Sequence, residues 1–168
     1  MRRCAGVGAS PGIGVGIAHY LGGRIDVQQR RIPPSELENE VRRFELALAR
    51  ADQQLGVVQE QLAARELDGQ QYRILEAHRL MLTDVHLVEE TRRIVREDGV
   101  SAEWAVRRAL DQIQQVLSRV EDPYFRDRRS DVDMVGEYII RNLMGIEVSA
   151  HESVPQGAVV YAHDVSPA

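Results

Sequence analysis

The sequence has a single cysteine, no lysine and no long unbroken apolar run. One cysteine excludes an intrachain disulfide and fits a reducing compartment. Every apolar stretch is shorter than the ~20 residues that cross a bilayer, and the glycine-broken start is a poor signal peptide. We therefore expect a cytoplasmic protein without a membrane span. The 26 acidic residues outnumber the 21 arginines, and this net charge of −5 argues against nucleic acid as a partner.

Motifs for several kinds of catalysis are also missing. Neither a dinucleotide-binding pattern nor a P-loop fits the glycine-rich start, and the Gly-x-Ser-x-Gly turn of many hydrolases is absent. The five histidines form no His-Glu-x-x-His motif, and no cysteine pair supports a zinc site. The residues alone predict no catalytic centre and no metal site. The carboxylate pairs Glu89–Glu90 and Asp131/Asp133 are expected on solvated helix faces, and His78 is expected to be partly exposed.

A long helix is predicted after Pro33. Ser35 is a favoured N-cap, and Glu38 follows three residues later, as in a capping box. Apolar residues then recur at spacings of four and three, forming a seam of Leu37, Val41, Phe44, Leu48, Ala51, Leu55, Val58 and Leu62. The seam fits either an intermolecular coiled coil or a helix in an antiparallel hairpin, and the well-capped neighbouring helices favour the hairpin.

Further helices are predicted to begin near Gln70, Asp84, Ser101 and Asp122, and the last one to end at Gly145. The helix after Ser101 is expected to bury a face of Ala105, Ala109, Ile113, Val116 and Val120.

Strands are predicted on both sides of these helices. Alternating residues indicate one strand over residues 13–21, and an apolar run indicates another at 158–162. Strands that flank a block of helices point to a helical insertion in an α/β domain. The predicted fold class is thus mostly α, with an antiparallel helical bundle at residues 33–145. The bundle is inserted in an incomplete α/β domain built from residues 1–32 and 146–168.

Four short segments then stand out by their order and spacing. They are residues 8–13 (GASPGI), 74–84 (ILEAHRLMLTD), 122–136 (DPYFRDRRSDVDMVG) and 164–167 (DVSP). In these segments the chain resembles the N-terminal part of enzyme I, the phosphoenolpyruvate–protein phosphotransferase of the bacterial sugar phosphotransferase system. The matching family segments include I-F-E-A-H-x-M-L-L-x-D and D-x-Y-x-x-E-R-x-x-D-[VI]-x-D-[IV]-G. The resemblance extends over essentially the whole chain.

The resemblance implies an α/β phosphohistidine domain with a helical, HPr-binding insertion. In this family a histidine takes phosphate from phosphoenolpyruvate and passes it to the small carrier protein HPr. That histidine lies in a G-G-x-[ST]-S-H motif, which does not occur in these 168 residues. The family's C-terminal barrel, which binds phosphoenolpyruvate and magnesium and forms the homodimer, is not matched either. We therefore expect a fragment that stops before the phosphohistidine, holds no cofactor and is inactive alone.

The resemblance also implies a docking face for HPr or an HPr-like carrier. Its matching positions are His78, Leu80, Met81, Asp84, Leu87, Leu117, Val120, Tyr124, Phe125 and Arg128. Several acidic residues of the family are replaced, so a basic carrier would be attracted less strongly. The replacements are Gly69, Gln70, Gln71, Thr83, Val85 and His86.

Two alternatives stay open at this point. One is a fragment of the nitrogen-branch paralogue of enzyme I, which has its own carrier. The other is a helical interaction or scaffold domain unrelated to phosphotransfer, in which the seam would be an intermolecular coiled coil.

Overall fold

The computed structural model describes residues 14–20, 25–64, 69–119, 123–146 and 156–161, with the backbone alone for residues 20, 64, 69–71, 123–129 and 161. The chain divides into two compact units. The smaller one comprises residues 1–23 and 150–165, and the helical one comprises residues 24–149 and 166–168. Among the described residues, helices far outnumber strands, which confirms the predicted mostly-α fold class.

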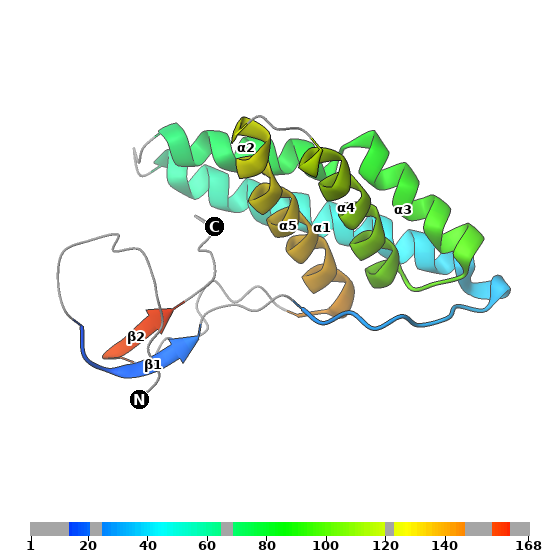
Figure 1. The fold of residues 1–168 in the computed structure, drawn as a ribbon, viewed down its shortest axis with the longest axis horizontal. Coiled ribbons are helices and arrows are strands. Elements are labelled where there is room, and N and C mark those ends of the chain that lie inside the picture. The colour runs from blue at the N-terminus through cyan, green and yellow to red at the C-terminus, as the bar shows by residue number, and fades with distance from the viewer. Residues whose placement is uncertain (1–13, 21–24, 65–68, 120–122, 147–155, 162–168) are drawn as a thin grey trace. The chain divides into compact units, whose positions relative to one another are not determined.

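The smaller unit contains a pair of short parallel strands, β1 (Ile17–Tyr20) and β2 (Ala158–Tyr161), with Ile17 opposite Ala158 (Figure 1). The first strand is shorter than the predicted residues 13–21. Gly16, directly before β1, has no room for a side chain, because a Cβ atom there would lie 2.1 Å from the carbonyl oxygen of Gly157. At this glycine, close packing of the backbone is the reason for the residue type.

The described residues of the helical unit form five α-helices, drawn from cyan to orange in Figure 1. They are α1 (Leu37–Ala64), α2 (Gly69–Leu82), α3 (Val85–Asp98), α4 (Ala102–Ser118) and α5 (Pro123–Met144). α1 and α2 lie side by side, and α5 packs against both α1 and α4. Gly99 ends α3 with a φ of 60°, and Gly145 follows α5 with a φ of 66°, as predicted for glycines after a helix.

The start of α1 differs from the prediction. Ser35 lies inside a short 3₁₀ turn, η1 (Pro34–Glu36), whose N-cap is Pro33, so the predicted Ser35 cap and its capping box are wrong. Glu38 instead pairs with Arg96 of α3, at 2.8 Å and 3.0 Å. The two prolines explain the difference, because they preset a turn before the helix can begin.

The apolar seam of α1 is buried inside the chain itself. Val41, Phe44, Ala51 and Leu55 are at most 3% exposed, and they pack into one core with residues of the other four helices. A seam that is already covered cannot form the interface of an intermolecular coiled coil. The structure therefore selects the hairpin explanation and contradicts the coiled-coil alternative.

The segment before α1 belongs with the helices. The backbone of Ile32 donates to the carbonyl of Gly99 at 2.8 Å, and that of Ser101 donates to the carbonyl of Arg30 at 2.9 Å. Arg107 holds the carbonyl of Ile25 at 3.0 Å. These bonds place residues 25–32 in the helical unit, not in the α/β part to which the prediction assigned them.

A partly buried charged cluster on α1 binds the start of α4 and the end of α5. Glu40 accepts a hydrogen bond from the backbone nitrogen of Ala102 at 2.7 Å, which satisfies the start of α4 where Ser101 makes no side-chain cap. Arg43 donates to Glu103 at 2.7 Å and to the carbonyl of Leu143 at 2.9 Å, near the end of α5. α1 therefore supplies the capping groups that α4 and α5 lack.

Candidate functional site

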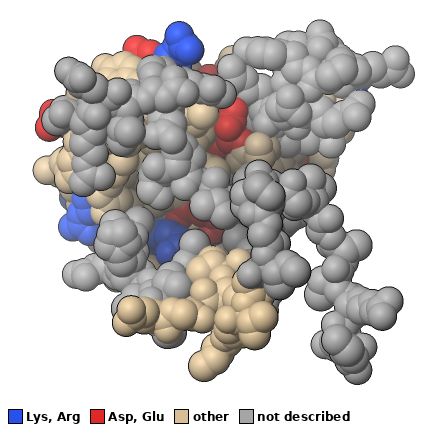
Figure 2. Space-filling model, turned by 90° about the vertical axis from the view of Figure 1, so that its left-hand side faces the viewer, with Lys and Arg blue, Asp and Glu red and all other residues tan. Residues whose placement is uncertain are grey.

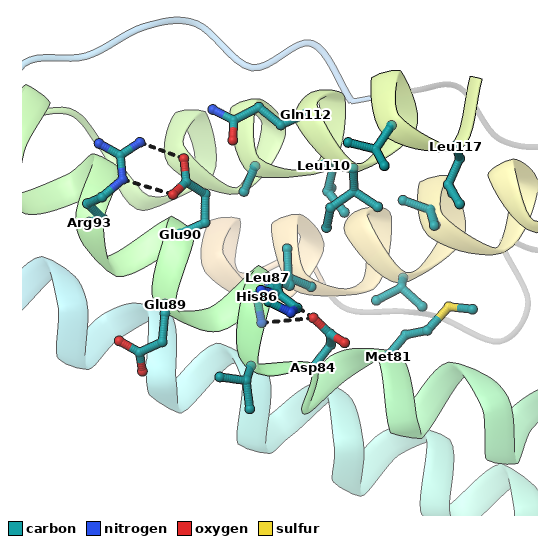
Figure 3. A pocket seen from close by; sticks show the side chains of 16 residues that line it. Met81, Asp84, His86, Leu87, Glu89, Glu90, Arg93, Leu110, Gln112 and Leu117 are labelled. Atoms are coloured by element: carbon teal, nitrogen blue, oxygen red, sulfur yellow. Dashed lines mark hydrogen bonds and ion pairs between the residues drawn. The ribbon is translucent and has the colours of Figure 1, made fainter. Parts of the chain in front are cut away.

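An apolar groove of about 800 Å³ lies along α3 and α4, with α5 beneath it. Among the described residues it is lined mainly by aliphatic side chains. They are Met81, Val85, Leu87, Ala109, Leu110, Ile113, Val116, Leu117, Val132 and Val135. In the close view, Met81 comes from a helix on one side of the groove, and Leu110 and Leu117 come from α4 on the other side (Figure 3).

The groove keeps apolar side chains in contact with water. Val85 is 69% exposed and Val116 is 62% exposed, whereas Leu87, Leu110 and Val135 beneath them are buried. Soluble proteins that expose a contiguous apolar surface of this kind commonly use it for a partner. The arrangement can bind apolar side chains, and it brings together no group of three or more potential metal ligands among the described residues.

The turn between α2 and α3 sets one wall of the groove. Asp84 is the N-cap of α3, and its Oδ1 accepts from the backbone nitrogens of His86 at 2.9 Å and Leu87 at 3.1 Å (Figure 3). Replacing such a cap by alanine typically costs about 1 kcal/mol. Asp84, which the resemblance placed on the docking face, thus has a structural role as well.

The charged side chains of α3 at the edge of the groove form ion pairs with one another. Arg93 donates to Glu90 at 2.6 Å and 2.8 Å, and to Glu97 at 2.6 Å. Hydrogen bonds from Arg93 lower the pKa of Glu90 below its ordinary value. Over the face seen in Figure 2, the described basic and acidic side chains also lie in small mixed groups. The groove is therefore suited to a partner that binds chiefly through apolar contact.

Ion pairs hold α3 in place from the other side. Arg92 pairs with Glu45 at 2.6 Å, and Arg96 pairs with Glu38 of the same helix, α1. The hydrogen bond from Arg96 lowers the pKa of Glu38. Pairs of this exposure contribute little stability each, but together they leave the opposite, apolar face of α3 turned to the groove.

The structure distributes the docking residues implied by the resemblance unevenly. Met81 and Leu117 are half-buried and line the groove with Asp84. Leu80 is 68% exposed but is not among the side chains that line it. Leu87 is only 2% exposed and supports the groove from below. Whether these residues contact a carrier stays a prediction.

Two expectations about buried polar groups are wrong. His78 is 1% exposed, not partly exposed, because α5 covers it. Its Nε2 lies 3.3 Å from Oδ1 of Asp131, so Asp131 does not sit on a freely solvated helix face as expected.

For the remaining docking positions the structure describes no side chain. Val120 lies outside them. Tyr124, Phe125 and Arg128 lie in the first half of α5, where the structure gives the backbone alone. Their part in the docking face rests on the resemblance.

The sequence prediction missed two exposed side chains of the groove. Val85 was noted only as a replaced acid, and Val116 was assigned to the core. Ile113 was also assigned to the core, and it does pack against the core while lining the groove. A signal was present in α4, since Ala109, Leu110, Ile113, Val116 and Leu117 form an apolar strip wider than one buried face needs. The excess width marks the side that faces the groove.

The helices of the described residues include none that is long and apolar enough to span a membrane.

Comparison with known proteins places the chain in a family. The family described as PEP-utilising enzyme, N-terminal, matches residues 5–128. The phosphoenolpyruvate-protein phosphotransferase of Cupriavidus necator is 30% identical over 173 residues, covering 97% of this chain and 29% of the relative. The one from Bacillus subtilis is 28% identical over 168 residues, covering 99% and 29%. The chain therefore spans less than a third of the length of these relatives.

A solved structure shows the same fold. The solution NMR structure of an enzyme I protein superposes with a TM-score of 0.74 at 29% identity, covering 95% of this chain and 64% of that one. Family match, relatives and structure agree with the segments that carry the resemblance. The chain belongs to the family of PEP-utilising enzyme N-terminal domains, and within it is of the enzyme I type.

Proposed function

We propose that the helical unit is the docking platform for a small phosphocarrier protein of the HPr type. In this proposal it serves a phosphotransferase that moves phosphate from phosphoenolpyruvate, through a histidine, to the carrier. The observation that carries the proposal is the apolar groove along α3 and α4, with Val85 and Val116 open to water. The membership in the enzyme I type supports it.

Binding energy is expected to come from a few side chains at the centre of the groove. Met81 and Leu117 are half-buried already, so a partner can complete their burial without ordering a flexible surface group. Central anchors of this kind typically cost about 2 kcal/mol or more when truncated. Truncation of Met81 is therefore expected to weaken carrier binding at least tenfold, which corresponds to about 1.4 kcal/mol.

Charge is expected to contribute less than apolar contact. Glu90 is paired with Arg93, and Glu89 is paired with Arg92 at 2.5 Å. Val85 and His86 stand where the family has acidic residues. A carrier that fits this face therefore needs fewer basic residues around its apolar centre, and its binding should respond only modestly to salt.

The proposal is tested by calorimetric titration of this chain with a purified HPr-like carrier. Met81→Ala and Val116→Ala remove groove side chains, and Val57→Ala is the matched control. Val57 is 48% exposed on α1 and does not line the groove. Both groove variants should lose affinity about tenfold, and the control should bind like the wild type.

Thermal melts of the same variants separate docking from folding. Met81 also packs against the core, so its truncation is expected to lower the melting temperature somewhat, whereas that of Val116 should lower it little. Equal carrier affinity in the wild type and both groove variants would remove this groove from the proposal.

The identity of the carrier is decided by titrating two carriers in parallel, one from the sugar branch and one from the nitrogen branch. The proposal of a carrier platform requires that at least one binds, and the tighter one identifies the branch. If neither binds, the proposed function is wrong for this chain.

A further inference from the structure

A buried histidine connects α2 to α5. His78 of α2 is 1% exposed, and its Nε2 lies 3.3 Å from Oδ1 of Asp131 in α5. The Asp131 side chain is 23% exposed, so the pair is screened from water mainly on the histidine side. It links side chains of these two helices across 53 residues of the sequence.

The pair fixes which histidine nitrogen carries a hydrogen. A carboxylate oxygen only accepts, so Nε2 of His78 must donate. Nδ1 is buried without a hydrogen-bond partner, and a second N–H there would be left unsatisfied. The surroundings therefore favour one tautomer, with the hydrogen on Nε2. A side chain constrained in this way holds its partner helix in one orientation.

The positions of the two residues relate them to the docking face. On α2, Met81 follows His78 by three residues, and so lies beside it on the helix. On α5, Tyr124 and Arg128 precede Asp131 by seven and three residues, which places all three along one side of that helix. The hydrogen bond joins the two helices at the base of the residues that the resemblance assigns to carrier binding.

We propose that His78 and Asp131 are positioning residues, which set the first half of α5 against α2 so that a carrier meets one continuous surface. This inference rests on the proposed function. It replaces the expectation that His78 contacts the carrier, because a side chain that is 1% exposed cannot do so in this conformation. The pair acts through the geometry of the helices that it joins.

The test compares substitutions that keep or remove the donor at position 78. Glutamine carries its Nε2 the same number of bonds from the backbone as histidine, so His78→Gln retains a donor towards Asp131. His78→Leu keeps an aliphatic volume but removes the donor. Asp131→Ala removes the acceptor, and a double variant of His78→Leu with Asp131→Ala completes a mutant cycle.

Carrier affinity is measured by titration at a temperature at which every variant is folded by circular dichroism. We expect His78→Leu and Asp131→Ala each to weaken binding about tenfold, and the double variant to be no weaker than the worse single one, since both remove the same bond. His78→Gln should restore affinity to within about threefold of the wild type. A purely structural role in stability would not produce this rescue of affinity among folded variants.

A second readout needs no carrier. Amide chemical shifts of residues 123–131 in the free chain should move in His78→Leu and return towards wild type in His78→Gln. Long-range ¹H–¹⁵N spectra of the imidazole should show the hydrogen on Nε2.

The outcomes separate this inference from the proposed function. If no carrier binds the wild type but the amide shifts follow the expected pattern, the proposed function fails and the positioning of α5 stands. If the carrier binds all variants equally, or if additive losses appear in the double variant, the inference is wrong although the carrier platform stands. A hydrogen on Nδ1 would also overturn it.

Discussion

The close packing of α5 against Leu110 of α4 makes Gly136 a sensitive test of the packing. A Cβ atom at Gly136 would lie 2.2 Å from Cδ1 of Leu110, which is 1% exposed. Carbon atoms in contact are normally at least ~3.5 Å apart, so Gly136→Ala requires a shift of roughly 1.3 Å in the side chain or the helix. Leu110 also lines the groove, so its displacement changes the groove floor.

The expected magnitude is a balance of two effects. Overpacking of a core typically costs 1–3 kcal/mol of stability, and for a contact this short we expect a cost of about 3 kcal/mol. Alanine in place of glycine within a helix gains about 1 kcal/mol. Gly136→Ala should therefore lose about 2 kcal/mol and lower the melting temperature by roughly 4–8 °C for a chain of this size.

A matched control and a compensating variant sharpen this test. Gly56→Ala in α1 places its Cβ 3.7 Å from the guanidinium of Arg79, an ordinary contact, and should stabilise the chain by up to ~1 kcal/mol. Leu110→Ala alone should cost about 2–5 kcal/mol. Combined with Gly136→Ala it should cost less than the sum, because the new methyl group occupies the vacated space. Thermal melts of all four variants measure this, and a Gly136→Ala chain as stable as Gly56→Ala would refute the packing argument.

Two further predictions concern acid stability and local order. Burial is the largest single influence on the pKa of Glu103 and acts to raise it. The hydrogen bond from Arg43, a backbone hydrogen bond and the charges of Arg43 and Arg30 together outweigh burial, so the pKa lies below its ordinary value of 4.5. The contribution of Glu103 to stability is therefore present above pH 4.5 and is lost as the pH falls through the lowered pKa. Glu103→Gln should be about 1–2 kcal/mol less stable at neutral pH, with the gap to wild type narrowing in acid; a gap independent of pH in urea unfolding would contradict this. In hydrogen exchange, the slowest amides should lie in the helices around Phe44, Ile94 and Ile139 and the faster ones in β1 and β2, and the reverse order would disprove that the helical core dominates stability.

Much of the helical unit could be predicted because its signals are local. The spacing of Val41, Phe44, Ala51 and Leu55 defines one face of α1, and that face is buried. Gly99 marks the end of α3 because an αL residue is needed there. Apolar periodicity and helix-ending glycines depend on residues close in the sequence, so they can be recognised without knowledge of the tertiary structure.

The errors arose where distant segments decide the environment. His78 resembles a partly exposed helix residue until α5 covers it, and Asp131 lies 53 residues away in the sequence. Val116 fits the core pattern of α4, yet it is 62% exposed. Glu40 caps α4 across 62 residues, a role that the sequence next to Ser101 does not reveal.

The groove itself was predictable only in part. Met81, Asp84 and Leu117 came from the resemblance and do line it. Val85 and Ile113 complete it through the packing of α3 against α4, which no motif encodes. A surface to which four helices contribute becomes visible only once their relative positions are known.

Chemical-shift mapping of the ¹⁵N-labelled chain with an unlabelled HPr-like carrier tests the central proposal most directly. The account predicts that shifted amides concentrate at residues 81–93 and 109–117, which contain most of the groove residues. The amides of Leu46 and Val57 on the outer face of α1 should not move. Shifts centred on α1, or no shifts at carrier concentrations that saturate an enzyme I relative, would contradict a carrier platform at this groove.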